Sequence, residues 1–220
     1  VEPGTVPAFG QSFDSNRPML RALIAADGHE VHDFPIVPDD AKALIATYRK
    51  AFVSCDVVIS SGGASDGDED HTQTALQALG AELVFWRLAM KPGRPMAVGS
   101  LGEKRLFCLP GNPVAAFVCY RLLAAPALTV MAGGKAGTIL RIPVQAGFAH
   151  RKRAGRAEYL RVRLQADDTG QIVMQLHGRR GAGVLSSLTG ADGLIEIPVE
   201  NAGVSEGDYL MFIPFREAGL

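Results

Sequence analysis

The feature that most constrains the fold is a change of hydrophobic periodicity at residues 132–137, which read Ala-Gly-Gly-Lys-Ala-Gly. Before this segment, short apolar runs alternate with segments whose apolar residues recur at helical spacing. After it the helical spacing is lost, and short alternating runs are separated by turn residues such as Gly170 and Gly207. These two patterns are typical of different architectures. We therefore predict two domains, residues 1–136 and residues 137–220.

The first domain is predicted to be α/β. One helix is expected between the capping residues Asp14-Ser15-Asn16 and Gly28, and a second after Pro38-Asp39-Asp40. Further helices are expected at 72–79 and 113–131, and strands at 30–34, 56–60, 83–88, 96–99 and 105–109. Because strands and helices alternate, we expect a three-layer α/β/α domain with a mostly parallel sheet.

The second domain is predicted to be all-β, a barrel or a sandwich. Alternating runs occur at residues 140–144, 158–164, 172–176, 194–198 and 209–213, and turn sequences separate them.

Composition excludes several classes of protein. Apolar residues make up 47% of the 220 residues, which is enough for a packed core, and the net charge of -1 argues against nucleic-acid and membrane-surface binding. Three cysteines without a C-x-x-C spacing argue against a disulfide framework and a zinc site. The most apolar stretch, residues 113–132, is interrupted by Arg121 and Pro126, so a buried helix is expected there. No secretory leader pattern opens the chain, and a cytoplasmic location is expected.

A glycine-rich, acidic segment lies between a predicted buried strand and a helix. It reads Ser60-Ser61-Gly62-Gly63-Ala64-Ser65-Asp66-Gly67-Asp68-Glu69-Asp70. Ligands of open parallel sheets bind at the carboxyl ends of the strands, and exposed N–H groups beside a helix start suit a phosphate. The acids would repel a bare phosphate, so a neighbouring Mg²⁺ is the consistent arrangement. The alternative is that they only cap the helix at Thr72.

Two further turns follow predicted strands. The segment from Arg87 to Pro95 carries three cations, Arg87, Lys91 and Arg94, around a Pro-Gly turn, and they could converge on one anion. The alternative is a solvated basic turn. Leu109-Pro110-Gly111-Asn112-Pro113 is a rigid turn before the longest helix, with Pro113 suited to the first helical position. Whether this turn is structural or binds a ligand is left open by its sequence.

Other chemistry is not indicated. Among the five histidines, one pair, His29 and His32, has an i, i+3 spacing, but it falls on a predicted strand and not on a helix. The histidines are therefore interpreted as surface or core residues. No Gly-x-Ser-x-Gly elbow occurs, and nothing favours a cysteine nucleophile.

The combination of motifs is more specific than any one of them. In order they are Asp14-Ser15-Asn16-Arg17, Ile36-Val37-Pro38-Asp39-Asp40, Ser61-Gly62-Gly63, Gly67-Asp68, Phe85-Trp86, Lys91-Pro92-Gly93 and Leu109-Pro110-Gly111-Asn112-Pro113, followed in the tail by Glu158-Tyr159-Leu160-Arg161-Val162, Leu185-Ser186-Ser187-Leu188 and Ala191-Asp192-Gly193-Leu194. This order and spacing resemble the molybdopterin molybdenumtransferases, the family of MoeA and the gephyrin E domain.

The resemblance implies a molybdopterin-binding (MogA-like) domain followed by a MoeA-type C-terminal β-barrel. Its members insert molybdenum from molybdate into adenylylated molybdopterin and release AMP with Mg²⁺. It implies catalytic roles for Asp39, Asp70, Arg87 and Lys91, with Asp70 also a metal ligand. The residues that it implies in pterin-nucleotide binding are Ser61, Gly62, Gly63, Ser65, Gly67, Asp68, Arg94, Pro110, Gly111 and Asn112.

The sequence departs from the family pattern in three respects. Arg87 stands where lysine is usual, which keeps the charge but changes the donor geometry. Asp66 stands where a small apolar residue is common. The family's N-terminal half, which ends in a Thr-Gly-Asp-Glu-Leu motif with a glutamate implicated in the metal step, would precede Val1. We therefore expect an incomplete fragment of a full-length homodimer, with doubtful activity alone.

Two other functions remain open. A molybdopterin adenylyltransferase resembles residues 61–70, but such proteins generally carry threonine at the position of Ala64 and lack the β tail. A ligand-binding or scaffold module without turnover, as in gephyrin, is the alternative from a different class.

Overall fold

A computed structural model describes residues 1–62, 69–135, 137–178, 181 and 183–215, with the backbone alone for Glu69 and Asp70. It separates into two compact units. Unit 1 comprises Val1–Leu88 and Pro95–Ala136, and unit 2 comprises Ala89–Arg94 and Gly137–Leu220. The assignment of Ala89–Arg94 to unit 2 was not expected, because this segment lies in the middle of the α/β pattern.

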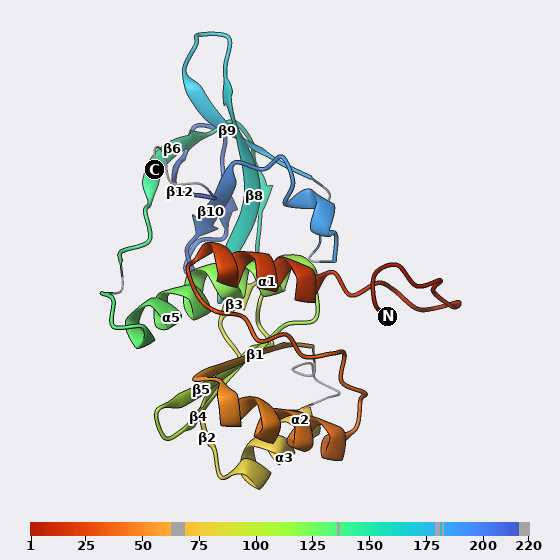
Figure 1. The fold of residues 1–220 in the computed structure, drawn as a ribbon. Coiled ribbons are helices and arrows are strands. Elements are labelled where there is room, and N and C mark those ends of the chain that lie inside the picture. Colours follow the sequence, from red (N-terminus) through yellow and green to blue (C-terminus); the bar gives the residue numbers. More distant parts are fainter. Residues whose placement is uncertain (63–68, 136, 179–180, 182, 216–220) are drawn as a thin grey trace. The chain divides into compact units, whose positions relative to one another are not determined.

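The predicted caps begin the first two helices of unit 1 (Figure 1). In α1 (Asn16–Ala26), Asp14 Oδ1 accepts hydrogen bonds from the backbone N–H of Asn16 and Arg17, at 3.0 and 3.2 Å. In α2 (Ala41–Ser54), Asp40 accepts one from the N–H of Ala43 at 2.8 Å. These bonds satisfy N–H groups that have no partner inside a helix. A third helix, α3 (Glu69–Leu79), ends before Gly80, which has a φ of 69°.

The longest helix runs from Pro113 to Met131 in three parts. They are α4 (Pro113–Cys119), a π-helical turn (Tyr120–Ala124) and α5 (Ala125–Met131). Pro126 has no N–H to donate to the preceding turn, and a π-helical turn accommodates that loss. By length and composition alone this helix could cross a membrane (mean hydropathy 1.8). However, Val114 to Cys119 are all buried inside unit 1, as in the core helix of a globular domain.

The sheet of unit 1 is mixed. Its strands are β1 (Val57–Ser61), β2 (Glu82–Trp86), β4 (Ala97–Leu101) and β5 (Lys104–Leu109), in the order β1-β5-β4-β2. Among the described residues, the β1–β5 pairing is parallel and the other two are antiparallel. The predicted mostly parallel sheet is therefore not confirmed. Gly102 and Glu103 alone connect β4 to β5, and a two-residue connection permits only an antiparallel hairpin.

The strand expected at residues 30–34 does not form. Asp33 instead lies against α1, where its carboxylate accepts from Arg17 Nε at 2.7 Å and pairs with Arg21 at 2.9 Å. Glu30 pairs with His32 at 3.1 Å on the exposed side. Because Val31 and Phe34 are the only apolar residues of this run, little hydrophobic burial favours pairing with the sheet.

Helices α2 and α3 lie side by side against one face of this sheet (Figure 1). Their apolar residues form one buried cluster with the strands: Tyr48, Phe52, Ala75, Leu76, Ala97, Leu106 and Cys108. Gly99 in β4 makes this packing possible, because a Cβ there would overlap the side chain of Leu76.

Unit 2 is a small barrel-like sheet with a short second sheet. Strands β8, β9, β6, β12 and β10 pair in that order, and β10 pairs back to β8, which closes a ring. These strands are β6 (Ile142–Ala146), β8 (Ala157–Ala166), β9 (Ile172–Leu176), β10 (Gly193–Ile197) and β12 (Tyr209–Pro214). The two-residue strand β3 (Met90–Lys91) pairs with the start of β8, and β7 (His150–Arg151) pairs with β11 (Gly203–Val204).

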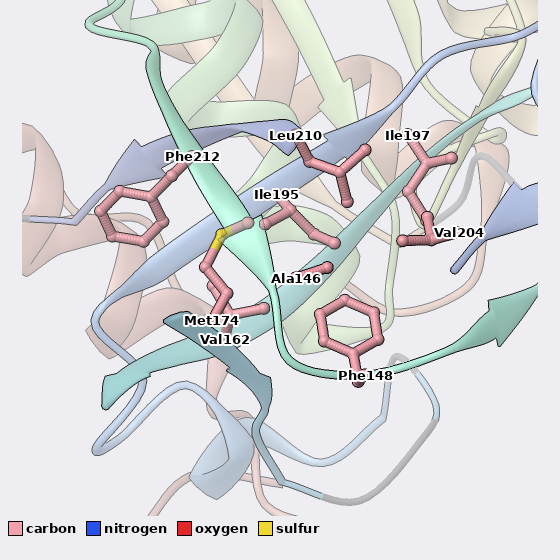
Figure 2. Packing of buried hydrophobic residues seen from close by; sticks show 9 residues of the cluster. All are labelled: Ala146, Phe148, Val162, Met174, Ile195, Ile197, Val204, Leu210 and Phe212. Carbon is pink, nitrogen blue, oxygen red and sulfur yellow. The ribbon is translucent and has the colours of Figure 1, made fainter. Parts of the chain in front are cut away.

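The interior of unit 2 is formed by one face of each long strand (Figure 2). Alternate residues point inward, as the period of a strand requires: Ile195 and Ile197 from β10, and Leu210 and Phe212 from β12. The other members of the buried cluster are Ala146, Phe148, Val162, Met174 and Val204.

Gly193 is needed where β10 meets β12. A Cβ at this position would overlap the carbonyl oxygen of Ile213 and would lie 2.5 Å from Phe212 Cε2. We expect Gly193→Ala to lower the free energy of unfolding by about 1–3 kcal/mol, the usual cost of overpacking a core. Denaturant titration measures the change. Gly137→Ala is the matched control, because a Cβ at Gly137 has no neighbour within 4 Å. Equal stability of both variants would contradict the expectation.

Candidate functional site

Two of the predicted loops meet at the carboxyl ends of β1 and β5. Ser61 lies opposite Leu109 in the parallel register, and the N–H of Gly62 donates to the carbonyl of Leu109 at 3.0 Å. A Cβ on Gly111 would lie 3.5 Å from Gly62 Cα, so the two loops are in direct contact. Gly62 has a φ of 86°, a conformation that favours glycine. Both loops thus leave the sheet at one point, next to the N-terminus of α4.

Asn16 fixes the second of these loops. Its Nδ2 donates to the carbonyl of Gly111 at 2.8 Å, and its side chain is buried. Its Oδ1 has no hydrogen-bond partner among the described residues. The N-terminal motif at residues 14–17 therefore has a structural role as well as capping α1: it ties α1 to the turn at Pro110, Gly111 and Asn112. In that turn the carbonyl of Asn112 accepts the first helical hydrogen bond, from Ala116 N at 2.9 Å.

A cavity of about 660 Å³ in unit 1 extends from Ser61 and Gly62 between α1, α2 and residues 29–40. Asp39, Ser61, Gly62, His71 and Thr72 all contribute to its lining. The carboxylate of Asp39 is 80% exposed, and its Oδ1 lies 3.9 Å from His71 Nε2. Since His71 follows Asp70 in α3, this contact brings Asp39 to the first turn of that helix.

Neutral side chains lie behind this site, and Tyr48 and Cys108 among them are buried. Tyr48 Oη lies 2.9 Å from Ser60 Oγ and 3.7 Å from Cys108 Sγ. Burial raises the pKa of Tyr48 and of Cys108, and it raises the pKa of Cys119 to about 12. These two cysteines stay protonated thiols, which agrees with the absence of any indication of a cysteine nucleophile.

Arg87 follows the end of β2 at the same edge of the sheet. Strand β2 is antiparallel to β4, and β4 is antiparallel to β5, so β2 points in the same direction as β1 and β5. Three strand spacings separate β2 from β1, which is about 15 Å. Arg87 is the one non-glycine residue with positive φ, at 66°, among those that the structure describes. Such a conformation is uncommon and costs free energy.

Lys91 and Arg94 belong to unit 2, not to unit 1. Both side chains are exposed, and the Lys91–Pro92 peptide bond is cis. Lys91 Nζ lies 2.8 Å from Glu158 Oε1, and Glu158 Oε2 lies 3.2 Å from His150 Nε2. The sequence interpretation missed this cluster. Glu158 lies in a motif to which the sequence assigns no role, and the sequence indicates a surface or core position for His150. The available signal was a lone carboxylate in a strand whose other charged residues are Arg161 and Arg163.

Gly63, Ser65, Gly67 and Asp68 lie outside the described residues, and for Asp70 only the backbone position in α3 is described. Since residues 62–70, 91–94 and 110–112 each follow a strand predicted for one sheet, their sequence positions predict a single cleft. This stays a prediction, because residues 91–94 belong to unit 2 and Gly62 and residues 110–112 to unit 1. In the described part of the chain, no group of three or more His, Cys, Asp or Glu side chains could hold a metal ion.

Sequence comparison identifies both parts of the chain. Residues 4–130 match the family described as "Probable molybdopterin binding domain", and residues 143–215 match the "MoeA C-terminal region (domain IV)". The chain therefore belongs to the family of molybdopterin-binding domains. The second match adds that this domain is joined to a C-terminal region of the MoeA type.

Similar proteins carry the same combination. A molybdopterin molybdenumtransferase of Haemophilus influenzae is 34% identical over 98% of this chain and 54% of its own length. The molybdenum cofactor synthesis protein cinnamon of Drosophila melanogaster is 32% identical over 88% of the chain and 32% of its own length. A solved molybdopterin biosynthesis MoeA protein from Pyrococcus horikoshii superposes with a TM-score of 0.80 at 29% identity, over 99% of this chain and 52% of that one. The chain thus spans about half the length of the first of these relatives.

Proposed function

We propose that the whole protein inserts molybdenum from molybdate into adenylylated molybdopterin, with release of AMP, and that these 220 residues supply part of its site. The observation that carries the proposal is the direct contact between Gly62 and Gly111 at the carboxyl ends of two parallel strands. A pterin nucleotide is an anion, and such a sheet edge beside a helix N-terminus is suited to anions. Relatives with the same two regions are named for this reaction.

The phosphate group is proposed to lie against the two glycine loops. Backbone N–H groups of these loops donate to it, and Asn16 holds the carbonyl of Gly111 away from the anion. The residues proposed to contact the nucleotide are Ser61, Gly62, Gly63, Ser65, Gly67, Asp68, Arg94, Pro110, Gly111 and Asn112. Arg87 and Lys91 are proposed to neutralise molybdate and the phosphate. The positive φ of Arg87 supports this role, because strained backbone often occurs at functional positions.

Mg²⁺ is proposed to bind between Asp39 and Asp70. Asp39 offers an exposed carboxylate that lies next to His71 and hence near the start of α3. Hard oxygen donors of this kind suit Mg²⁺. When bound, the ion would supply positive charge to the phosphate oxygens, and the two carboxylates would hold it.

The finer organisation is also proposed. We assign residues 1–136 to the pterin-binding domain and residues 137–220 to the barrel domain, with residues 89–94 packed as part of the barrel unit. A three-layer arrangement of unit 1 is supported by the sheet face opposite α2 and α3, where Val98, Phe107 and Leu109 are buried and α4 contacts β5. A homodimer of the whole protein and a cytoplasmic location complete the proposal.

The test is a calorimetric titration of the 220-residue polypeptide with adenylylated molybdopterin and Mg²⁺ under anaerobic conditions. We expect saturable binding. A parallel reaction with ATP and molybdopterin should show no consumption of ATP, whereas consumption would indicate an adenylyltransferase. Binding of receptor-derived peptides without any affinity for the pterin nucleotide would indicate a scaffold module. Either of these two results would contradict the proposal.

A further inference from the structure

The backbone of β3 holds Lys91 beside Glu158. Strand β3 runs parallel to β8, with Met90 opposite Ala157 and Lys91 opposite Glu158. The N–H of Ala157 donates to the carbonyl of Ala89 at 2.9 Å, which fixes this register. Neighbouring residues of paired strands interact through their side chains. The sheet of unit 2 therefore fixes the backbone position of Lys91.

Glu158 is a buried carboxylate whose two oxygens each have a cationic or hydrogen-bonding partner. Its side chain is 5% exposed, whereas that of Lys91 is 64% exposed. Oε1 lies 2.8 Å from Lys91 Nζ, and Oε2 lies 3.2 Å from His150 Nε2, whose side chain is 10% exposed. Burial opposes ionisation of Glu158, but the hydrogen bonds from Lys91 and His150 outweigh it and lower the pKa of this carboxyl. Glu158 is thus a fixed, buried anion paired with a solvent-facing lysine.

We propose that Glu158, fixed by His150, is a positioning residue that holds the ammonium of Lys91 ready for the anionic group of the pterin nucleotide. This inference rests on the proposed function, because it takes Lys91 as a contact of that ligand. An ammonium has three N–H donors, so one bond to Glu158 leaves two for the ligand. A lysine held in this way loses less conformational freedom when the ligand binds than a lysine that moves freely.

A purely electrostatic role for Glu158 predicts a change in ligand affinity of opposite sign to that predicted by a positioning role. If the carboxylate acted only through its charge, it would repel the incoming anion, and its removal would tighten binding. If it acts by positioning, its removal frees Lys91, and binding weakens. For the positioning role we expect Glu158→Ala to weaken affinity for adenylylated molybdopterin about threefold to tenfold. Glu158→Gln should lose less, because its amide oxygen still accepts a hydrogen bond from Lys91.

A double-mutant cycle separates positioning from a general structural effect. Affinity of the 220-residue chain for adenylylated molybdopterin with Mg²⁺ is measured by calorimetry for Lys91→Ala, Glu158→Ala and the double variant. A residue that acts through Lys91 adds nothing once Lys91 is removed, so the double variant should bind as Lys91→Ala does. Additive losses would show that Glu158 acts on the fold instead, and would overturn the inference.

Glu196→Gln serves as the matched control. Glu196 lies in β10 of the same sheet and pairs with Arg141 at 3.1 Å, so its substitution also breaks a carboxylate–cation pair in unit 2. Affinity should stay unchanged in this variant. Thermal unfolding of every variant checks the fold, and Glu158→Gln provides a near-isosteric substitution should Glu158→Ala fail to fold.

The outcomes distinguish the inference from the function on which it rests. If Lys91→Ala binds the nucleotide as well as the parent chain, the proposed role of Lys91 is wrong. If Lys91→Ala binds weakly while Glu158→Ala and Glu158→Gln bind normally or more tightly, the role of Lys91 stands and the positioning role of Glu158 is overturned.

Discussion

A polypeptide of these 220 residues is expected to bind adenylylated molybdopterin but to insert molybdenum about 10² to 10⁴ times more slowly than a whole homologue. Metal insertion requires groups that surround both molybdate and the pterin dithiolene. The 220 residues correspond to 54% of the Haemophilus relative and 52% of the Pyrococcus structure. The family resemblance predicts a glutamate of the metal step in the part of these relatives that the 220 residues do not cover. Absence of one acid or base group alone gives a loss of this size.

The measurement is reconstitution of a molybdenum-free apoenzyme in the presence of adenylylated molybdopterin, Mg²⁺ and molybdate. The whole Haemophilus relative, assayed in parallel, gives the reference rate. A titration of the same preparation with the nucleotide shows that the short polypeptide is folded and competent to bind. Turnover close to the reference rate would mean that the groups described in units 1 and 2 are sufficient, contrary to the expectation.

Lys91→Ala is expected to weaken binding of adenylylated molybdopterin by about tenfold to a hundredfold, which corresponds to the loss of one charge-assisted contact. The fold should survive, because the Lys91 side chain is 64% exposed and its only described partner, Glu158, keeps His150. The removal also leaves Glu158 with less compensation for its charge, so a modest decrease in stability is expected besides the loss of affinity.

Calorimetric titration and circular dichroism together decide this prediction. Lys50→Ala is the control, since Lys50 is an exposed lysine on α2 and no role in binding is assigned to it. Its affinity should match that of the parent chain. If Lys91→Ala also matched the parent chain while retaining its spectrum, Lys91 would be an ordinary solvated residue of a turn.

Local sequence signals predicted most elements of both units. The caps Asp14 and Asp40, the strand before Gly62 and the long helix after Asn112 lie where capping, burial and turn chemistry placed them. In unit 2, the strand predicted at residues 172–176 coincides with β9. Strong periodicity and short-range hydrogen bonds determine such elements, and neither depends on the rest of the fold.

Features set by tertiary contacts were predicted poorly. The run at residues 30–34 resembles a strand, but ion pairs of Asp33 with Arg17 and Arg21 hold it against α1. The expected mostly parallel sheet is also not confirmed, because the Gly102-Glu103 turn joins β4 to β5 as a hairpin. Direction depends on connections, whereas a hydrophobic pattern reports only burial.

In the candidate site, too, local features were predicted and long-range contacts were not. Sequence motifs indicated the glycine loops, and the structure brings Gly62 and Gly111 together. The partners of Lys91 were not predicted, because Glu158 and His150 lie 67 and 59 positions further along the chain and only the pairing of β3 with β8 brings them near. Motif spacing contains no information on such long-range contacts.

The membership of Ala89–Arg94 in unit 2 has a consequence for the unity of the chain. The polypeptide passes between the two units three times, after Leu88, after Arg94 and after Ala136. A fragment that begins at Gly137 would lack β3. The backbone of β8 at Ala157 and Glu158 would then have no strand paired on the side where β3 lies. Unpaired strand edges recruit foreign strands. Recombination at a single breakpoint therefore could not transfer the C-terminal barrel as a complete unit. The basic turn that carries Lys91 has to be transferred with it.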